Sequence, residues 1–332
     1  MANLELLSHA QVHRGILKDG REVAVKVQYP GIGYAAAADL RVCSWIASVC
    51  SALGVAGVAP LQRILKSLVR RMREETNLKR ELGNALRLQD CLPAGPVTVA
   101  QPLPELSSRR ILVTEWVDGV EVTDTAALQR RGICAKAVGH ALLTAFAETV
   151  YVQGCMHGDL SPANILVRGS GDSFEVVLLD HGWQVAIPAQ LRRQYCRLWC
   201  SFVLQDEAGA LAVAEEIAGP RGREIVPVVL QMTSGRRAGH QERKQQGSDG
   251  LRGLGGLQNL SAVSHLPPEL VEILRVSHGV RGVTTVLGLT AADRLNVNCR
   301  HALQGLSMEA SVQRARWVRF FVLRAGTLAA AS

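Results

Sequence analysis

Three groups of polar residues in this chain are spaced in a way that suits the handling of a polyphosphate and a metal ion. The first is Lys26, which ends the apolar string Val23-Ala24-Val25-Lys26 directly after a predicted hairpin. A lysine fixed on a strand places an ammonium group where it can neutralise phosphate oxygens. Because most lysines on strand faces are simply solvated charges, this signal depends on the two groups that follow along the chain.

The second group is the string His157-Gly158-Asp159-Leu160-Ser161-Pro162-Ala163-Asn164, which leads into an apolar strand at 165–167. In this spacing Asp159 can accept or orient the proton of a substrate hydroxyl, and Asn164 returns across the turn to hold a metal ion. The alternative is a turn in which the two side chains only satisfy backbone groups. The H-x-D-x-x-x-x-N spacing before a strand favours the catalytic interpretation.

The third group is Asp180-His181-Gly182, at the end of the apolar run 174–179. An aspartate at the exposed end of such a strand suits a Mg²⁺ ligand. Asp159 and Asp180 would repel each other, and a divalent cation with a polyphosphate between them relieves that repulsion. The order of the three groups therefore predicts ATP and Mg²⁺ as cofactors, with phosphoryl transfer or ATP hydrolysis as the reaction.

The elements that must position these residues follow from the periodicity of the apolar residues. Alternation, helical spacing and turn signals such as Asp19-Gly20 predict strands at 10–16, 22–28, 110–116, 165–167 and 174–179, and helices at 35–53, 61–90 and 128–153. The remainder is mostly helical. This order predicts an α+β protein with a bilobal protein-kinase-like fold, a small mixed N-lobe at 1–118 and a mainly helical C-lobe at 119–332.

Two stretches do not fit that pattern. Residues 235–256 are rich in Gly, Gln and Arg with few apolar groups, which predicts a flexible surface insert. Residues 42–61 carry no charge over a length that could span a bilayer. Serines, glycines and a proline within the stretch favour a buried helix and turn, with a membrane segment as the alternative.

Composition limits the class of protein. The 332 residues carry a formal charge of +8 and are 48% hydrophobic but only 4% aromatic, so that the core must rest on aliphatic side chains. No zinc-finger spacing or basic run interleaved with aromatics is present, which argues against nucleic acid and for a phosphorylated ligand or an anionic membrane face. The eight cysteines form no C-x-x-C pair and are predicted to be buried reduced thiols. We expect no signal or transit peptide.

A carboxylate partner for Lys26 and a site for the nucleotide base are also needed. Glu74, Glu75 and Glu81 on the predicted 61–90 helix are candidates for the partner, although each could equally be a solvated charge. The string Ile111-Leu112-Val113-Thr114-Glu115-Trp116-Val117-Asp118-Gly119 resembles a kinase hinge, where backbone groups meet adenine.

Two strings resemble one known family. Ala10-Gln11-Val12-His13 and the string from Val23 to Ile32, Val-Ala-Val-Lys-Val-Gln-Tyr-Pro-Gly-Ile, are similar to the aarF-domain-containing, UbiB-like (ADCK) atypical protein kinases. Asp180-His181-Gly182 in place of Asp-Phe-Gly resembles the branch of human paralogues one and five, as does Leu266-Pro267-Pro268-Glu269-Leu270. The resemblance covers nearly the whole chain and implies binding of ATP with Mg²⁺.

The resemblance assigns roles residue by residue. It implies that Lys26, Glu81 and Asp159 are catalytic, with Glu81 as the ion-pair partner of Lys26, and that Asn164 and Asp180 are the metal ligands. It implies nucleotide contacts from Ser8, Ala10, Val12, Ala24, Lys26, Glu115 and Val117.

The chain departs from the family pattern in several places. The K-x-G-Q element of the family is expected upstream of Met1, the alanine-rich loop is reduced to Leu6-Leu7-Ser8-His9-Ala10, and Asn77 replaces an Asp. The chain thus resembles a truncated or divergent member. The family's links to quinone and prenyl-lipid metabolism imply a mitochondrial or plastid location, a lipid or quinone-pathway partner and peripheral membrane contact.

Two other functions are compatible with the motifs. One is a small-molecule phosphotransferase of the aminoglycoside or choline-kinase type, whose catalytic loops often carry H-G-D-L-x-x-x-N; the Val27–Ile32 string is not typical of that group. The other is a catalytically impaired scaffold that binds nucleotide or lipid. The complete set of Lys26, Asp159, Asn164 and Asp180 argues against the scaffold.

Overall fold

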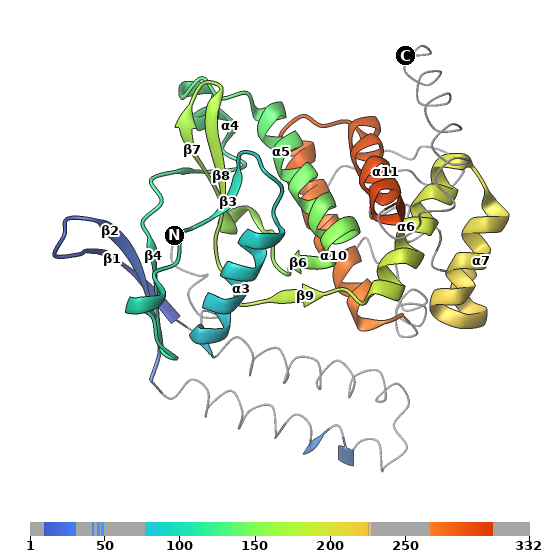
Figure 1. Ribbon diagram of the computed structural model, residues 1–332, viewed down its shortest axis with the longest axis horizontal. Helices are drawn as coiled ribbons and strands as arrows, with labels where there is room; N and C mark the ends of the chain where they lie inside the picture. Colours follow the sequence, from blue (N-terminus) through green and yellow to red (C-terminus); the bar gives the residue numbers. More distant parts are fainter. Residues whose placement is uncertain are drawn as a thin grey trace. The chain divides into compact units, whose positions relative to one another are not determined.

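Among the described residues, strands and helices alternate up to residue 186 and only helices follow, which confirms the predicted α+β class (Figure 1). The computed structural model describes residues 10–30, 77–224 and 266–307, with a few isolated positions elsewhere. These residues divide into two units. The first contains residues 1–142, 155–185 and 275–288, and the second contains 143–154, 186–274 and 289–332. The lobe boundary predicted after residue 118 stays a prediction.

The first unit begins with a three-stranded antiparallel sheet in the order β1 (Ala10–Ile16), β2 (Glu22–Gln28), β4 (Ile111–Glu115). The first two strands have the predicted bounds because their turn is local: Leu17 donates its N–H to Arg21, and Gly20 takes φ 87°. A positive φ costs glycine little. Directly paired residues share one face of an antiparallel sheet, so Lys26 shares its face with Val12 and Leu112.

A second sheet in the same unit carries the strand that follows the His157–Asn164 string. It has four strands in the order β3 (Val97–Val99), β8 (Ser173–Leu178), β7 (Ile165–Ser170), β5 (Val120–Glu121). Two short strands, β6 (Cys155–His157) and β9 (Gln184–Ala186), pair separately. The sequence did not predict β3, β5, β6 or β9. Strands of two or three residues are too short to show alternation, and their pairing partners define them.

Helix α3 (Leu78–Cys91) packs against β4, β3 and β6 within the first unit. Asn77 caps it by accepting a hydrogen bond from the Lys79 N–H. Leu78 and Leu82 of the helix share a buried apolar cluster with Leu112 of β4. This cluster fixes the helix beside the sheet that carries Lys26. Residues 61–76, the first part of the predicted 61–90 helix, lie outside the described residues.

The single helix predicted at 128–153 is wrong. The chain instead forms α4 (Thr125–Arg130), a turn, α5 (Ala135–Ala147) and a π-helical segment, η3 (Glu148–Gln153). Gly132 takes φ 69° in the turn, which breaks the helix while the apolar periodicity continues on both sides. Short 3₁₀ turns occur at η2 (Pro104–Leu106) and η4 (Pro162–Asn164).

Helices make up the described part of the second unit. Helix α6 (Ala189–Leu204) contacts α7 (Glu207–Ala218), α11 (Ala291–Ser307) and η3, and the short helix η5 (Gly219–Glu224) packs on α7. Tyr151 stacks on Tyr195 with ring centroids 5.5 Å apart, and its ring meets Trp199 edge to face. Helix α10 (Pro268–Val286) begins in this unit and continues into the first.

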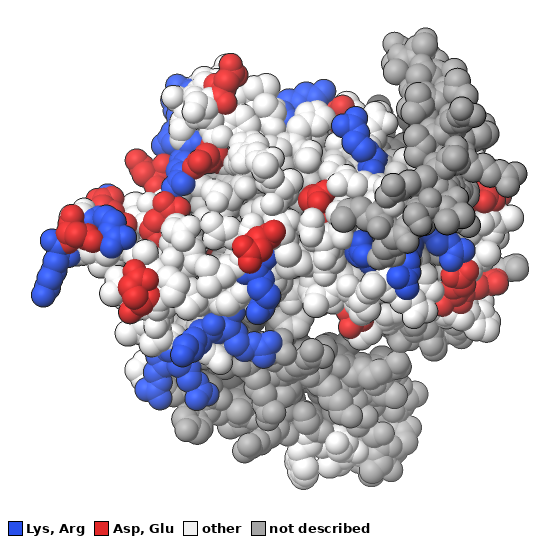
Figure 2. Space-filling view, viewed as in Figure 1, with Lys and Arg blue, Asp and Glu red and all other residues white. Residues whose placement is uncertain are grey.

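Charged side chains are distributed unevenly over the face shown in Figure 2. Basic and acidic side chains lie intermingled over the β1–β2 hairpin, whereas Lys and Arg side chains gather near the start of α3 (Figure 2). There, Leu78 donates its N–H to the Arg109 carbonyl, which brings together four exposed basic residues: Lys79, Arg80, Arg109 and Arg110.

Three further predictions concern a membrane-spanning segment, a surface insert and the burial of the cysteines. Among the described residues, no helix is both long and apolar enough to cross a bilayer. The 42–61 stretch lies almost entirely outside the described residues, and the 235–256 insert lies wholly outside them. The six described cysteines form no disulfide with one another; Cys196, Cys200 and Cys299 are buried. Cys134 is exposed, so the prediction of buried thiols is wrong for that residue.

Candidate active site

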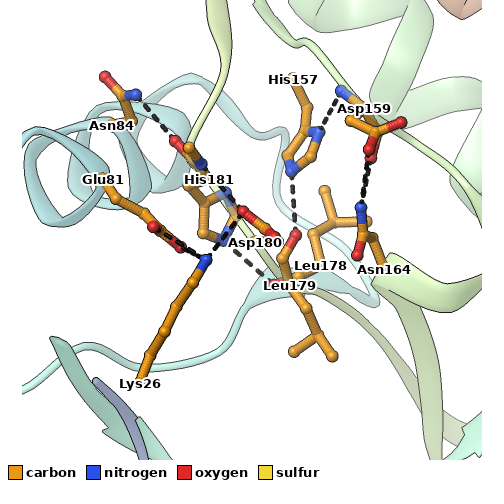
Figure 3. Close-up of polar contacts among 11 residues, drawn as sticks. Lys26, Glu81, Asn84, His157, Asp159, Asn164, Leu178, Leu179, Asp180 and His181 are labelled. Carbon is orange, nitrogen blue, oxygen red and sulfur yellow. Dashed lines mark hydrogen bonds and ion pairs between the residues drawn. The ribbon is translucent and has the colours of Figure 1, made fainter. Parts of the chain in front are cut away.

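Lys26 lies between two carboxylates from distant parts of the chain (Figure 3). Its Nζ is 2.9 Å from Oε1 of Glu81 and 3.2 Å from Oδ1 of Asp180. Strand β2 supplies the lysine and the first turn of α3 supplies Glu81. Asp180 follows β8 with φ 50°, a left-handed conformation that is strained for a residue other than glycine. The Gly182 N–H donates to Asp180 Oδ1, which holds the carboxylate in this turn.

Burial sets the electrostatics of this ion-paired group. The Glu81 side chain is only 4% exposed, and burial raises its pKa to about 7 against the opposing effect of Lys26. Burial also works to lower the pKa of Lys26, but the Glu81 and Asp180 carboxylates outweigh it, so the pKa is raised. The pKa of Asp180 is lowered, because the Lys26 ammonium outweighs the effect of burial.

The next turn of α3 is tied to the same segment by a buried hydrogen bond. Asn84, three residues after Glu81, donates its Nδ2 to the His181 carbonyl at 2.8 Å. Residues three apart on a helix lie on one face, so Glu81 and Asn84 both point toward the 180–182 turn. The sequence interpretation missed Asn84. Its spacing from Glu81 was the available signal.

The His157–Asn164 string, predicted to be the catalytic loop, folds around His157 (Figure 3). The ring Nδ1 accepts a hydrogen bond from the Asp159 N–H, and Nε2 lies 3.1 Å from the Leu179 carbonyl. Asn164 donates its Nδ2 to both the backbone oxygen and Oδ2 of Asp159, and its carbonyl accepts from the Leu179 N–H. The segment just before Asp180 is therefore bound from both ends of the loop.

Two histidine rings fill the space beneath these loops. His157 and His181 lie edge to face with centroids 5.0 Å apart, and both are buried. Burial lowers the pKa of His157, and burial together with His157 lowers the pKa of His181 to about 3. Both rings are therefore neutral at physiological pH. Nδ1 of His181 has no hydrogen-bond partner in the described part of the structure.

Gly158 occupies a position with no room for a side chain. A Cβ there would lie 1.9 Å from Cδ1 of Trp183, and the Gly158 N–H donates to the Trp183 carbonyl at 2.8 Å. The Gly158 carbonyl in turn accepts a hydrogen bond from Arg275 of α10. The middle residue of His-Gly-Asp is thus a glycine because the 180–184 segment packs directly on it.

The sheet face that carries Lys26 also carries other expected nucleotide contacts. Val12 is 56% exposed and pairs with Lys26, and Ala24 lies two residues before it on the same face. Ala10, in contrast, is buried. Ser8 lies outside the described residues.

The expected hinge residues use their side chains elsewhere. The Glu115 carboxylate accepts hydrogen bonds from Arg168 at 2.8 Å and from the Gln101 N–H at 3.0 Å. Val117 is buried in an apolar cluster with Ala100 and Val177. Any contact from Glu115 or Val117 to a nucleotide base must therefore come from backbone atoms.

The remaining question of geometry is the metal site. Within the residues that the structure describes, no group of three or more His, Cys, Asp or Glu side chains could hold a metal ion. Asp180 and Asn164, the expected ligands, both hydrogen-bond to residues of the loops around them.

Sequence comparison decides the family. The ABC1 atypical kinase-like domain matches residues 7–214, well over half of the chain, and the match includes every residue of the site described above except Arg275. The chain belongs to the ABC1 atypical kinase-like family. This agrees with the resemblance to aarF-domain-containing kinases, since relatives that match this chain are named for either the AarF domain or the ABC1 family.

The relatives of this ABC1-family chain are longer proteins. It is 26% identical over 299 residues to AarF domain-containing protein kinase 1 of Xenopus laevis, covering 85% of this chain and 56% of that protein. AarF domain-containing protein kinase 1 of Gallus gallus is 30% identical over 205 residues, or 60% of this chain and 38% of the relative. The chain thus spans just over half the length of the first of these relatives and less of the second.

A solved structure shows the same fold. The Rv3197–erythromycin complex from Mycobacterium tuberculosis superposes on the ABC1-family chain with a TM-score of 0.60 at 20% identity. The match covers 84% of this chain and 71% of that one. The chain therefore has the kinase-like fold that the order of its motifs predicts.

Proposed function

We propose that this chain binds ATP together with Mg²⁺ and acts as an atypical kinase or ATPase. The observation that carries the proposal is the position of Lys26, whose ammonium contacts both Glu81 and Asp180. A lysine that pairs with a helix carboxylate, beside the aspartate of a D-x-G turn, is the arrangement that kinases use to hold phosphates and metal. The membership of the ABC1 family supports it.

The residues present fit a nucleotide. Lys26 is 20% exposed, so its ammonium can exchange one carboxylate contact for phosphate oxygens. The exposed apolar side chain of Val12 lies on the same sheet face and would cover the base or the sugar, with Ala24 leaving space beside it. The backbone of Glu115 and Val117 would bind the base edge. The family resemblance adds nucleotide contacts from Ser8 and from Ala10, the first residue of β1.

The residues also fit a magnesium ion. Mg²⁺ prefers one or two protein oxygens and takes the others from water and substrate phosphates, so it needs no large carboxylate cluster. The Asp180 side chain is half exposed, at 50%, and the lowered pKa keeps it ionised. Asn164 donates through Nδ2 to the loop, which directs its Oδ1 as an acceptor. Bound Mg²⁺ would neutralise charge on the phosphates as it does in other kinase-like folds.

Asp159 would be the residue that orients the attacking hydroxyl or water. Its backbone N–H is held by His157, and its Oδ2 accepts a hydrogen bond from Asn164 at 3.2 Å. The second carboxylate oxygen can then accept the proton of the nucleophile. Glu81 would hold Lys26 in place during this step.

The biological setting is a proposal from the family resemblance. We infer a role in quinone or prenyl-lipid metabolism, a mitochondrial or plastid location, and peripheral contact with a membrane or a lipid-pathway partner. The exposed basic residues near the start of α3 would suit an anionic surface.

A nucleotide-induced thermal shift tests the proposal. Ligands that bind the folded state raise the melting temperature by mass action. We expect ATP with Mg²⁺ to raise it, Asp180→Asn to remove the Mg²⁺-dependent part of the shift, and Asp172→Asn to leave it unchanged. Asp172 is a matched control because it lies exposed in the β7–β8 turn and the substitution makes the same charge change.

The results separate the alternatives. If ATP–Mg²⁺ gives no shift with the intact chain, the enzyme proposal fails and a scaffold remains. If ATP shifts the chain equally with and without Mg²⁺, the metal assignment of Asp180 and Asn164 fails. Turnover assays with and without an acceptor then separate an ATPase from a kinase.

A further inference from the structure

One face of α3 contacts Lys26 at its first turn and the 180–184 segment at the turns that follow. Glu81 faces Lys26, Asn84 bonds to the His181 carbonyl, and Arg87 donates its Nε to Oε1 of Gln184 at 3.3 Å. The last residue of this face, one turn further, is Cys91, at the C-terminal end of the helix. The spacing places Cys91 on the side of α3 that faces Gln184 and its neighbours.

One neighbour of Cys91 on this side is a second thiol. Cys155 is the first residue of β6, and its thiol shares a hydrogen bond with the thiol of Cys91. The Gln184 side-chain amide fixes the position of Cys155: its Nε2 lies 2.9 Å from Cys155 Sγ and 3.4 Å from the Asn84 carbonyl of α3. Both thiols are free and only partly buried. Neither residue is part of the proposed nucleotide site.

We propose that Cys91 and Cys155 are a redox modification site, a dithiol that forms a reversible intrachain disulfide between α3 and β6. The proposal is independent of the nucleotide chemistry. Its basis is the packing of α3 on β6, the Gln184 amide that holds Cys155 Sγ beside α3, and the hydrogen bond between the two partly exposed thiols. A disulfide requires Cβ atoms about 3.5–4.5 Å apart, a spacing compatible with two thiols that share a hydrogen bond.

The chemistry is thiol–disulfide exchange with a small disulfide such as oxidised glutathione. Burial and the hydrogen bond to Cys91 raise the pKa of Cys155 to about 12, so Cys91 supplies the attacking thiolate. The Cys91 sulfur forms a bond with one glutathione sulfur and expels the other half as a thiolate. Cys155 then loses its proton to that thiolate, attacks Cys91 Sγ, and releases the second glutathione. Two protein thiols are oxidised and one glutathione disulfide is reduced.

The bond would join the two halves of the catalytic machinery covalently. Helix α3 carries Glu81 and Asn84, and β6 ends at His157, two residues before Asp159. Closing the chain between residues 91 and 155 restricts the unfolded state more than the folded one, so it should stabilise the fold. The crosslink would also hold α3 against the catalytic loop.

Peptide mass mapping of the full chain after oxidation tests this directly. Incubation with oxidised glutathione should give a linked peptide pair that contains Cys91 and Cys155, and a melting temperature about 5 °C higher. Dithiothreitol should reverse both changes. Cys91→Ser should abolish the crosslink, whereas Cys155→Ser should leave a glutathione adduct on Cys91. Cys134→Ser, which removes an exposed thiol from the α4–α5 connection, is the control and should change neither result.

Other outcomes overturn the proposal. The mapping of the unaltered chain resolves all eight cysteines, so its result does not depend on how well the variants fold. Glutathione adducts at Cys91 or Cys134 without the linked pair would show that the two thiols do not combine. Full retention of both thiols under oxidation would show that the contact is structural only.

Discussion

The two halves of the candidate site are built on different physical principles. The ionic half consists of Lys26, Glu81 and Asp180, three charged groups from separate elements. The other half is the loop from His157 to Asn164, called the neutral half here because hydrogen bonds and a histidine ring pair hold it and no ion pair does so among the described residues. Charged groups respond to pH and to ligands, whereas a hydrogen-bonded loop responds mainly to shape.

The difference has a consequence for function. Glu81 is buried with a raised pKa, so the ionic half is costly to keep charged until a ligand compensates it. The polar groups of the neutral half already have hydrogen-bond partners within the loop and the 179 segment, so Asp159 is held in position without a ligand. Segment 179–181 joins the two, since it contacts His157 through Leu179 and Lys26 through Asp180.

The largest effect should come from a change of shape in the neutral half. Gly158→Ala would place a Cβ 1.9 Å from Cδ1 of Trp183 and 2.8 Å from its carbonyl oxygen. Backbone cannot move aside cheaply, so we expect a loss of about 3 kcal/mol or more in the free energy of unfolding. Urea unfolding measures it. Gly282→Ala is the control, because a Cβ there meets nothing within 4 Å on helix α10 and should be neutral or stabilising. Equal effects of the two substitutions would show that Gly158 is not packed as described.

A change of charge in the ionic half should come next. Because the pKa of Glu81 is about 7 in the folded chain and its ordinary value is 4.5, the folded chain binds an extra proton between these pH values. Its contribution to stability is therefore full below pH 4.5 and falls by about 3 kcal/mol as the pH rises to 7. Glu81→Gln cannot titrate and should lack this decline.

The measurement is the free energy of unfolding of both proteins from pH 4.5 to 8, without nucleotide. The difference between wild type and Glu81→Gln should move in favour of the variant as the pH rises. A difference that moves in favour of the wild type would mean that Lys26 lowers the pKa of Glu81, as in an ordinary ion pair. In that case both halves of the site would be stable without a ligand.

The smallest effect at neutral pH should come from the ring between the halves. His181→Phe removes a buried ring whose Nδ1 has no partner within the described structure and loses the contact of Nε2 with the Leu178 carbonyl. We expect a change below about 1 kcal/mol at pH 7. The folded-state pKa of His181 is about 3, so the wild type loses stability as the pH falls below 6.5, and the variant should gain on it by about 1 kcal/mol at pH 5.5.

The measurement is the free energy of unfolding of both proteins as the pH is lowered below 6.5. His13→Phe, on the exposed strand β1, should leave the acid side of the curve unchanged. If His181→Phe also leaves it unchanged, protonation of the ring pair does not limit stability, and the neutral half owes its acid response to other groups.

The neutral half could be predicted from the sequence because its information is local. The eight residues from His157 to Asn164 and the strand after them define one turn, and the β1–β2 hairpin is defined by Asp19-Gly20 in the same way. The helix at 128–153 was wrong although its signal was local too. Gly132 was visible in the sequence, but apolar residues at helical spacing continue past it and conceal the break.

The ionic half could be predicted only in its residue types. Three glutamates were candidates for the partner of Lys26, and periodicity alone does not rank them; the family resemblance selected Glu81. Asn84 and Trp183 were missed because their role depends on contacts with residues distant in the chain. The pairing of β6 with β9 and the contact of Cys91 with Cys155 depend in the same way on tertiary packing.

The hydrogen bond from Arg275 to the Gly158 carbonyl has a consequence for the order of folding. It joins residues 117 positions apart, and helix α10 leaves the ribosome well after the catalytic loop has been synthesised. Contacts of such long range form slowly because a large loop must close first. During synthesis the other hydrogen bonds of the His157–Asn164 loop join residues 157–179, whereas the bond from Arg275 can form only after α10 has been made. The last contact made to the site during synthesis is thus a contact to the motif that is easiest to recognise in the sequence.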